Sequence, residues 1–391
     1  MFIVNYILFY PIAIFINVVV HEFGHAIPAL LLTKQRVEVF IGSYGDEKKS
    51  FPLRTKFINI WFNPNVFLKG RGLCRQTAKN TPIKKQLIYV AGGPAASFML
   101  TCIAIFYSPI YNADGDMNGG HFVFVSAAMA TFFVSIIPRK KRIITAGNNQ
   151  ISNDGAQLQR LWRLRKYEKE YYKAYEAYNA KDYNTSADLC EALWNKRIKV
   201  QELFTYALSS MLMAKQYSRA LSFCKEIKDT SNLNEDDYCL ISLAEIHSKL
   251  YEEAVIALKL SLGLNPNHYN SLNNIGYVYT VIGEFNTAIE YLDRAIAVNP
   301  LFGYAFNNRG YAKIKTGDLA GGYDDVQKSL ELDNTDAYTY RNLGVYYMHL
   351  GEFDKALQQL IKAKEMDSNT DMIDDLIAET QNSLTTATLN Q

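Results

Sequence analysis

The chain has 391 residues, of which 49% are hydrophobic and 20% are charged, and this composition excludes a disordered or collagen-like protein. Its 41 basic and 39 acidic residues leave a net charge of only +2, so nucleic acid is not an expected partner. The charge is unevenly distributed, however. Residues 1–167 carry 20 basic and 7 acidic side chains, whereas residues 168–391 carry 21 basic and 32 acidic ones. We therefore expect two regions in different surroundings.

Three long segments predict membrane spans because they are almost free of charge. They are residues 1–33, where His21, Glu22 and His25 are the only His, Asp, Glu, Lys or Arg residues, and residues 86–113 and 117–138, which contain no Asp, Glu, Lys or Arg. Each segment is long enough to cross a hydrocarbon core, which requires about 20 apolar residues. The first 160 residues are therefore expected to form a polytopic helical membrane domain surrounded by lipid.

The charges between these spans predict their orientation. Residues 34–85 hold 12 basic side chains against three acidic ones, and residues 139–142 are all basic. The turn between the second and third spans contains only Asp114 and Asp116 as charged residues. Because loops rich in Lys and Arg stay in the cytosol, we expect the N-terminus outside and the C-terminal half in the cytosol.

The sequence His21-Glu22-Phe23-Gly24-His25 is an HExxH motif inside the first span. Two imidazoles four residues apart project from one face of a helix and can hold one Zn²⁺. Glu22 can then accept a proton from the attacking water. Two His and one Glu are costly within a bilayer unless they line a polar cavity or bind something. The motif therefore predicts a zinc site with Glu22 as the catalytic base.

A catalytic zinc usually takes three protein ligands and leaves one position open. The candidates for the third ligand are Asp114, Asp116, His121 and Asp154. Asp154 follows the third span on its inner side, and His21 and His25 lie nearer the inner end of the first span. Asp154 can therefore reach them, whereas the outer acids would have to cross much of the bilayer.

Three motifs in this order resemble the site-2 protease type of intramembrane zinc metalloprotease, over about residues 1–160. They are HEFGH at 21–25, Ala91-Gly92-Gly93-Pro94-Ala95-Ala96-Ser97, which is similar to the family's glycine-proline element, and Asn153-Asp154-Gly155, which is similar to its Asp-Gly pair. The chain departs from the family at Ser97, where Asn is common, and in the 15 residues that separate Pro138 from Asp154.

The resemblance implies a zinc endopeptidase that cleaves transmembrane segments of membrane proteins. It implies His21, His25 and Asp154 as zinc ligands and Glu22 as the base. Gly92, Gly93 and Pro94 are implied to contact the substrate; a helix-packing or kink site is the alternative. The first loop contains alternating pieces such as residues 36–41, and these predict a short strand hairpin at the membrane surface that either pairs with an unwound substrate or only covers the site.

A 34-residue period governs the chain after residue 200: Gly276, Gly310 and Gly344 are spaced by 34. This period is that of tetratricopeptide repeats (TPR), and residues 272–277 and 288–292 resemble that family. We expect six helix pairs over 168–368 and a capping helix at 371–383. The predicted fold is therefore all-α dominated, a membrane domain at 1–160 followed by a cytosolic TPR α-solenoid at 168–383.

Asparagines recur at equivalent positions of successive repeats, at Asn274, Asn308 and Asn342. Their amides can bond an extended peptide backbone, which predicts a groove for a cytosolic peptide or protein; plain solvated positions are the alternative. The function favoured is an intramembrane zinc endopeptidase whose repeats recognise a substrate or regulator. The alternative is a catalytically inactive, membrane-anchored TPR scaffold for protein assembly, which has no need of the buried motif.

Overall fold

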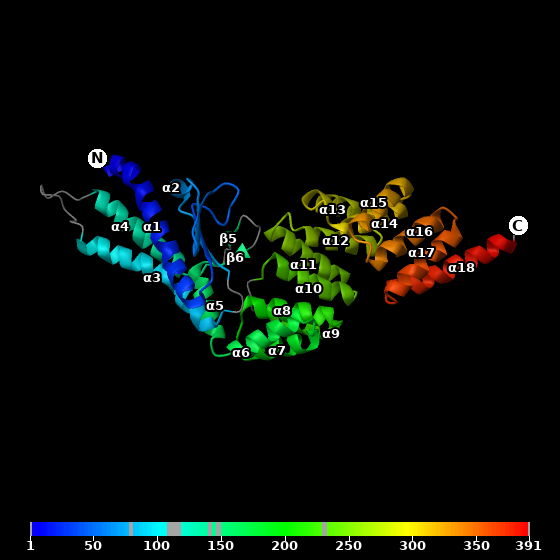
Figure 1. The fold of residues 1–391 in the computed structure, drawn as a ribbon. Coiled ribbons are helices and arrows are strands. Elements are labelled where there is room, and N and C mark those ends of the chain that lie inside the picture. The colour runs from blue at the N-terminus through cyan, green and yellow to red at the C-terminus, as the bar shows by residue number, and fades with distance from the viewer. Residues whose placement is uncertain are drawn as a thin grey trace. The chain divides into compact units, whose positions relative to one another are not determined.

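The computed structural model describes residues 2–77, 81–107, 119–139, 143–145, 150–228 and 233–389. These residues form 18 helices and two small sheets, so the described chain is mostly helical, as predicted. The chain divides into two compact units (Figure 1). The first comprises Met1–Asn179 and Leu189–Leu203, and the second Ala180–Asp188 and Phe204–Gln391. The first unit thus includes α6 (Glu168–Asn179), a helix that the repeat spacing assigns to the array.

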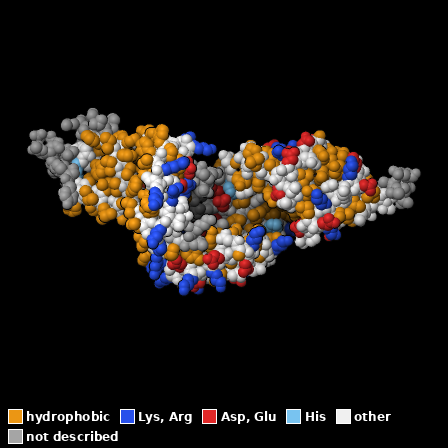
Figure 2. Space-filling view, viewed as in Figure 1, with side chains coloured by type: hydrophobic (Ala, Val, Ile, Leu, Met, Phe, Trp, Pro, Cys, Tyr) orange, Lys and Arg blue, Asp and Glu red, His pale blue; other side chains and the backbone are white. Residues whose placement is uncertain are grey.

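Three apolar helices pack against one another in the first unit: α1 (Phe2–Thr33), α3 (Ile83–Tyr107) and α4 (Gly119–Ile136). Each is long and apolar enough to cross a membrane, over Phe9–Thr33, Ile83–Phe106 and Gly119–Ile136. Large side chains such as Leu31 and Phe106 project outward and are 70% and 82% exposed. Figure 2 shows the surface over these helices as almost continuously hydrophobic. Such a surface suits a lipid environment.

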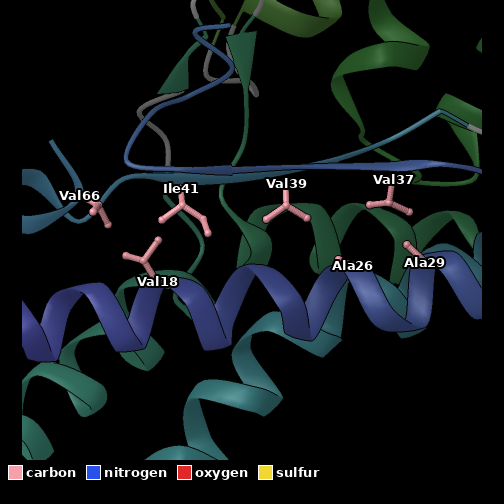
Figure 3. Packing of buried hydrophobic residues seen from close by; sticks show 7 residues of the cluster. All are labelled: Val18, Ala26, Ala29, Val37, Val39, Ile41 and Val66. Atoms are coloured by element: carbon pink, nitrogen blue, oxygen red, sulfur yellow. The ribbon is translucent and has the colours of Figure 1, made fainter. Parts of the chain in front are cut away.

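A four-stranded sheet lies along α1. Its strands are β1 (Val37–Ile41), β2 (Phe51–Arg54), β3 (Ile58–Phe62) and β4 (Gly72–Gln76), in the order β2-β3-β1-β4. The β1 side chains Val37, Val39 and Ile41 pack on Val18, Ala26 and Ala29 of α1, and Val66 of the short helix α2 (Val66–Lys69) completes the cluster (Figure 3). The sheet is thereby fixed beside the helix that carries the HExxH motif.

A strand hairpin forms in the first loop, as predicted, and residues 37–41 form a strand of the same sheet without being part of the hairpin. β1 is an inner strand, parallel to β3 and antiparallel to β4, while the hairpin is formed by β2 and β3. The open edges therefore belong to β2 and β4, and β1 cannot add a further strand.

The remaining elements of the chain are helical, apart from the two-residue strands β5 (Ile143–Ile144) and β6 (Gln150–Ile151). The helices are α5 (Asp154–Leu164), α6 (Glu168–Asn179), α7 (Tyr183–Asn195), α8 (Gln201–Met213), α9 (Tyr217–Lys228), α10 (Glu235–His247), α11 (Tyr251–Leu264), α12 (Tyr269–Val281), α13 (Phe285–Val298), α14 (Gly303–Thr316), α15 (Leu319–Leu332), α16 (Ala337–His349), α17 (Phe353–Met366) and α18 (Ile373–Leu389). From α6 to α17 they follow the six expected pairs.

The recurring small residues let the two helices of a repeat approach closely. A Cβ atom on Gly276 of α12 would lie 2.6 Å from Cγ of Leu292 on α13, and one on Gly344 of α16 would lie 2.6 Å from Cγ of Leu360 on α17. Both leucines are fully buried. The 34-residue period is therefore a packing requirement, because a larger residue would push the paired helices apart.

Candidate metal centre

Two imidazoles and one carboxylate converge in the first unit. Nε2 of His21 lies 3.0 Å and Nε2 of His25 3.4 Å from Oδ2 of Asp154, and the two Nε2 atoms are 3.2 Å apart. Both histidines are less than 9% exposed. These three residues form the one group of potential metal ligands found among the described residues, with one ligand atom each within 4.8 Å of the others. Two nitrogens and one carboxylate are the donor set of a catalytic zinc site.

Helix α3 orients both imidazole rings through contacts with their Nδ1 atoms, on the opposite side of each ring from Asp154. Nδ1 of His25 lies 2.8 Å from the carbonyl oxygen of Tyr89, and Nδ1 of His21 lies 2.9 Å from Oγ of Ser97. The same Nδ1 atom of His25 lies 3.3 Å from the backbone nitrogen of Gly93. These contacts engage Nδ1 of His25, so Nε2, which faces Asp154, is the nitrogen available to a metal. Ser97 stands where the family that this chain resembles commonly has Asn, and its hydroxyl is hydrogen-bonded to His21 of the predicted metal site.

Asn153 secures Asp154 at the first turn of α5. The Asn153 side chain accepts a hydrogen bond from the backbone N–H of Ala156, which caps the helix. Its amide nitrogen donates to the carbonyl oxygens of Ser135 and Ile137, at the end of α4, over 3.0 and 2.7 Å. Asn153 thus joins the two ends of the 15-residue insertion.

The surroundings of Asp154 favour its ionised form. Burial alone would raise the pKa of the Asp154 carboxyl, but hydrogen bonds with His21 and His25 hold that pKa well below its usual range. Gly155 makes the close approach to α4 possible, since a Cβ there would lie 2.0 Å from the carbonyl oxygen of Ile136. An ionised carboxylate is the form that binds a metal.

The glycine-proline element packs against the metal helix. A Cβ on Gly92 would lie 2.0 Å from the carbonyl oxygen of Gly24, and one on Gly93 would lie 2.1 Å from Nε2 of His25. None of Gly92, Gly93 and Pro94 lines the cavity at the centre. The close packing of both glycines on α1 agrees with the helix-packing alternative, and contact of the three residues with substrate stays a prediction.

A cavity of about 940 Å³ opens at the metal cluster. The side chains of His21, Glu22, His25 and Asp154 line it, together with residues of β4 and α4. Glu22 is 6% exposed, and a Cβ on Gly72 of β4 would lie 2.4 Å from its Oε1 atom. The open-edged strand β4 therefore runs directly past the predicted base.

Of the other candidates for the third ligand, His121 is described by the structure and is not part of this cluster. His121 lies in the first turn of α4, whereas the carbonyls bonded to Asn153 belong to its last turn and the residue after it. Asp114 and Asp116 lie outside the described residues.

The repeat asparagines bond to one another across successive helices. Nδ2 of Asn342 donates to Oδ1 of Asn307 over 2.8 Å, and Nδ2 of Asn308 donates to Oδ1 of Asn273 over 3.0 Å. Asn342 is 1% exposed, and the guanidinium group of Arg341 donates two hydrogen bonds to its side-chain oxygen Oδ1. The bonds between asparagines join Asn342 and Asn308 each to a neighbour of the preceding repeat and leave Asn342 buried, whereas Asn274 and Asn308 are half-buried. Binding of a peptide by the three asparagines stays a prediction.

Sequence inspection missed the partners that hold the cluster. Tyr89 acts through its backbone carbonyl, for which no side-chain signal exists. Asn153 carried a signal, because Asn directly before a helix is a strong N-cap. The hydrogen bonds that its side-chain amide donates to α4 could not be predicted, because they join residues that are far apart in the sequence.

Sequence models of the family described as tetratricopeptide repeat match residues 269–300 and 326–358. No curated protein matches the chain. Similar solved structures include a tetratricopeptide repeat protein from Parabacteroides merdae, with 17% identity over 55% of this chain and 98% of that one and a TM-score of 0.41. A thermophilic TPR protein of Thermus thermophilus shares 19% identity over 52% and 99%, with a TM-score of 0.36. MamA from Desulfovibrio magneticus shares 22% over 44% and 96%, with a TM-score of 0.35. The second unit therefore contains tetratricopeptide repeats.

Proposed function

We propose that the first unit is an intramembrane zinc endopeptidase of the site-2 protease type, and that the cytosolic repeats recognise its substrate or a regulator. The observation that supports this most is the convergence of His21 and His25, from the apolar helix α1, with Asp154 at the start of α5. Such groups are costly in a bilayer unless they bind something.

The residues present fit a zinc ion. His21, His25 and Asp154 would hold it, and their outer partners Ser97, Tyr89 and Asn153 fix the orientation of each donor. When bound, zinc would act as a Lewis acid that polarises a peptide carbonyl and lowers the pKa of water. Glu22 would take the proton of the attacking water and pass it to the leaving amine.

The length of α4 supports a position of the centre near the inner membrane boundary. Its 18 residues span about 27 Å, close to the hydrocarbon thickness of about 30 Å. Asp154 is bonded through Asn153 to the C-terminal end of this helix. Water would then reach the cavity from the cytosol without crossing the bilayer.

The substrate would bind as an extended strand at β4. A helical peptide bond is shielded by its own hydrogen bonds, so a substrate span must unwind before it is cut. Among the described strands, β4 lies at an edge of the sheet, and its Gly72 lies against Glu22. Strand addition at this edge would pair β4 with the unwound segment. This assigns to β4 the role first predicted for residues 36–41.

Replacing Glu22 by Gln tests the proposal. The substitution keeps the size of the side chain but removes the base, so cleavage of a co-expressed single-span protein should fall by at least about a hundredfold. The zinc content of the purified protein, measured by mass spectrometry, should not change. His21→Ala serves as the matched control that loses both zinc and cleavage. Undiminished cleavage by Glu22→Gln would refute a role as base.

A membrane-anchored repeat scaffold is the second candidate, and the matches to tetratricopeptide repeats support it because such repeats generally bind proteins. A scaffold has no use for zinc, however. Zinc-free protein purified without chelators, together with undiminished partner binding by His21→Ala, would favour the scaffold.

A further inference from the structure

The cavity at the metal centre has a strongly cationic wall. Three basic side chains line it: Lys69 and Arg71, which flank the start of β4, and Arg139, which follows α4. The acidic side chains among its lining residues are Glu22 and Asp154, and both belong to the metal centre. A bound divalent cation would offset these two charges and leave the wall with three uncompensated positive charges.

The three cations of this wall have no carboxylate partner among the described residues, and this distinguishes them from a neighbour on the same strand. Arg75 of β4 forms ion pairs with Glu38 and with Glu47, the latter over 2.9 Å. Arg71 instead lies over the ring of Tyr44, with its guanidinium carbon 5.4 Å from the ring centroid. Arg71 is thus held in place while its charge remains available to the cavity.

Tyr44 links this wall to the predicted base. Burial raises the pKa of its phenol, and the charges of Arg71, Glu22 and Arg139 all act on it. Gly72, the residue after Arg71, lies against Glu22, so an anion bound by Arg71 would lie near the predicted base.

A cationic wall attracts an anion, and the backbone of an uncharged apolar segment does not supply one. An aspartate or glutamate side chain does, and Arg binds carboxylates with two parallel hydrogen bonds. Most membrane spans lack a carboxylate side chain. A cationic wall would therefore select the few spans that carry one.

We propose that Arg71 and Arg139, assisted by Lys69, bind an acidic side chain of the substrate segment close to the bond that is cut. The inference rests on the proposed protease function and defines its substrate class: membrane segments that carry Asp or Glu beside the scissile bond. Strand β4 would bind the backbone of the substrate segment, and the cationic wall would bind one acidic side chain of that segment.

Binding of labelled peptides to the full-length Glu22→Gln protein tests the proposal independently of cleavage. The probes are apolar single-span peptides that carry one Asp, moved stepwise along the segment, each paired with the same peptide carrying Asn. In nanodiscs of phosphatidylcholine, fluorescence anisotropy should show about tenfold tighter binding of the Asp peptide at one or two positions, because hydrogen bonds to charged groups are strong. Adding Arg71→Gln and Arg139→Gln should remove this preference. Lys56→Gln, on the β2–β3 hairpin away from the cavity lining, is the control that should keep it.

Equal binding of Asp and Asn peptides at every position would overturn the inference, as would a preference that survives both arginine substitutions. A preference abolished by phosphatidylglycerol in the nanodisc would assign the wall to lipid phosphate and also overturn it. The two proposals fail separately. Asp-selective binding without any cleavage by the unsubstituted protein would refute the protease alone, whereas cleavage that depends on Glu22 but ignores the acid would refute the acidic substrate class alone.

Discussion

Asn153 joins two elements that the chain separates by a long basic loop. Its oxygen caps α5, and its amide hydrogens bond the end of α4. Asn153→Asp keeps the capping oxygen, since Asn and Asp cap equally well, but loses every donated bond. We expect zinc affinity, measured by competition with a chelator, to fall about 10–100-fold, as for other partners of metal ligands.

Asn153→Ala, which also removes the cap, should lower zinc affinity at least as far. Asn234→Asp at the N-cap of α10, where the Asn side chain accepts from a backbone N–H, controls for the substitution itself and should leave zinc affinity unchanged. Unaltered zinc affinity of Asn153→Asp would show that the link to α4 does not position Asp154.

Gly93 leaves room for a ring of the metal centre. A Cβ at this position would lie 2.1 Å from Nε2 of His25, the predicted ligand atom. Gly93→Ala must therefore displace the ring, and we expect most of the bound zinc to be lost from the purified protein. Gly263→Ala, where a Cβ would meet no atom within 4 Å, is the matched control and should retain zinc. Full zinc content in Gly93→Ala would mean that the ring is not fixed as described.

At the scale of elements, the sequence predicted local secondary structure better than it predicted the pairing of distant segments. The alternation at residues 36–41 predicted a strand, and β1 is there. Its parallel pairing with β3 depends on the packing of both strands against α1, which no local pattern encodes. The repeat helices were predictable because their small residues recur at a fixed period. The bonds between Asn342 and Asn307 were not, since polar residues on a helix face look alike whether buried or exposed.

Asn342 contributes to the stability of the repeats. Its amide donates to Asn307 and its oxygen accepts from Arg341, and the residue is 1% exposed. Asn342→Ala leaves these partners unsatisfied, so α14 to α16 should be destabilised by about 1–3 kcal/mol. Amide hydrogen exchange of these helices in the full chain measures the effect. Asn267→Ala, on an exposed loop, should change it little. Amide hydrogen exchange of these helices that is as slow in Asn342→Ala as in the unsubstituted protein would show that the bonds of Asn342 are not needed for stability.

At the scale of the whole molecule, the near-zero net charge conceals two opposite excesses. The basic excess lies in the unit with the apolar helices, and the acidic excess lies mostly in the repeats. In the predicted topology, basic loops would flank the inner ends of the spans, and an acidic repeat array would not adhere to an anionic inner leaflet. Charge distribution and hydrophobicity therefore support the same topology.

Three spans in the predicted orientation would place residues 116 and 362 on opposite sides of the membrane, which chemical labelling can test. In a Cys74→Ser, Cys102→Ser background, a cysteine replacing exposed Lys362 on α17 should react with a membrane-impermeant maleimide only after the cells are permeabilised. A cysteine replacing Asp116, in the turn predicted to lie outside, should react in intact cells and serves as the positive control. If the Lys362 position reacts in intact cells, the repeats face outward, and the proposed cytosolic recognition of substrate by the repeats is excluded. If neither position reacts until the cells are permeabilised, α4 does not cross the membrane between them.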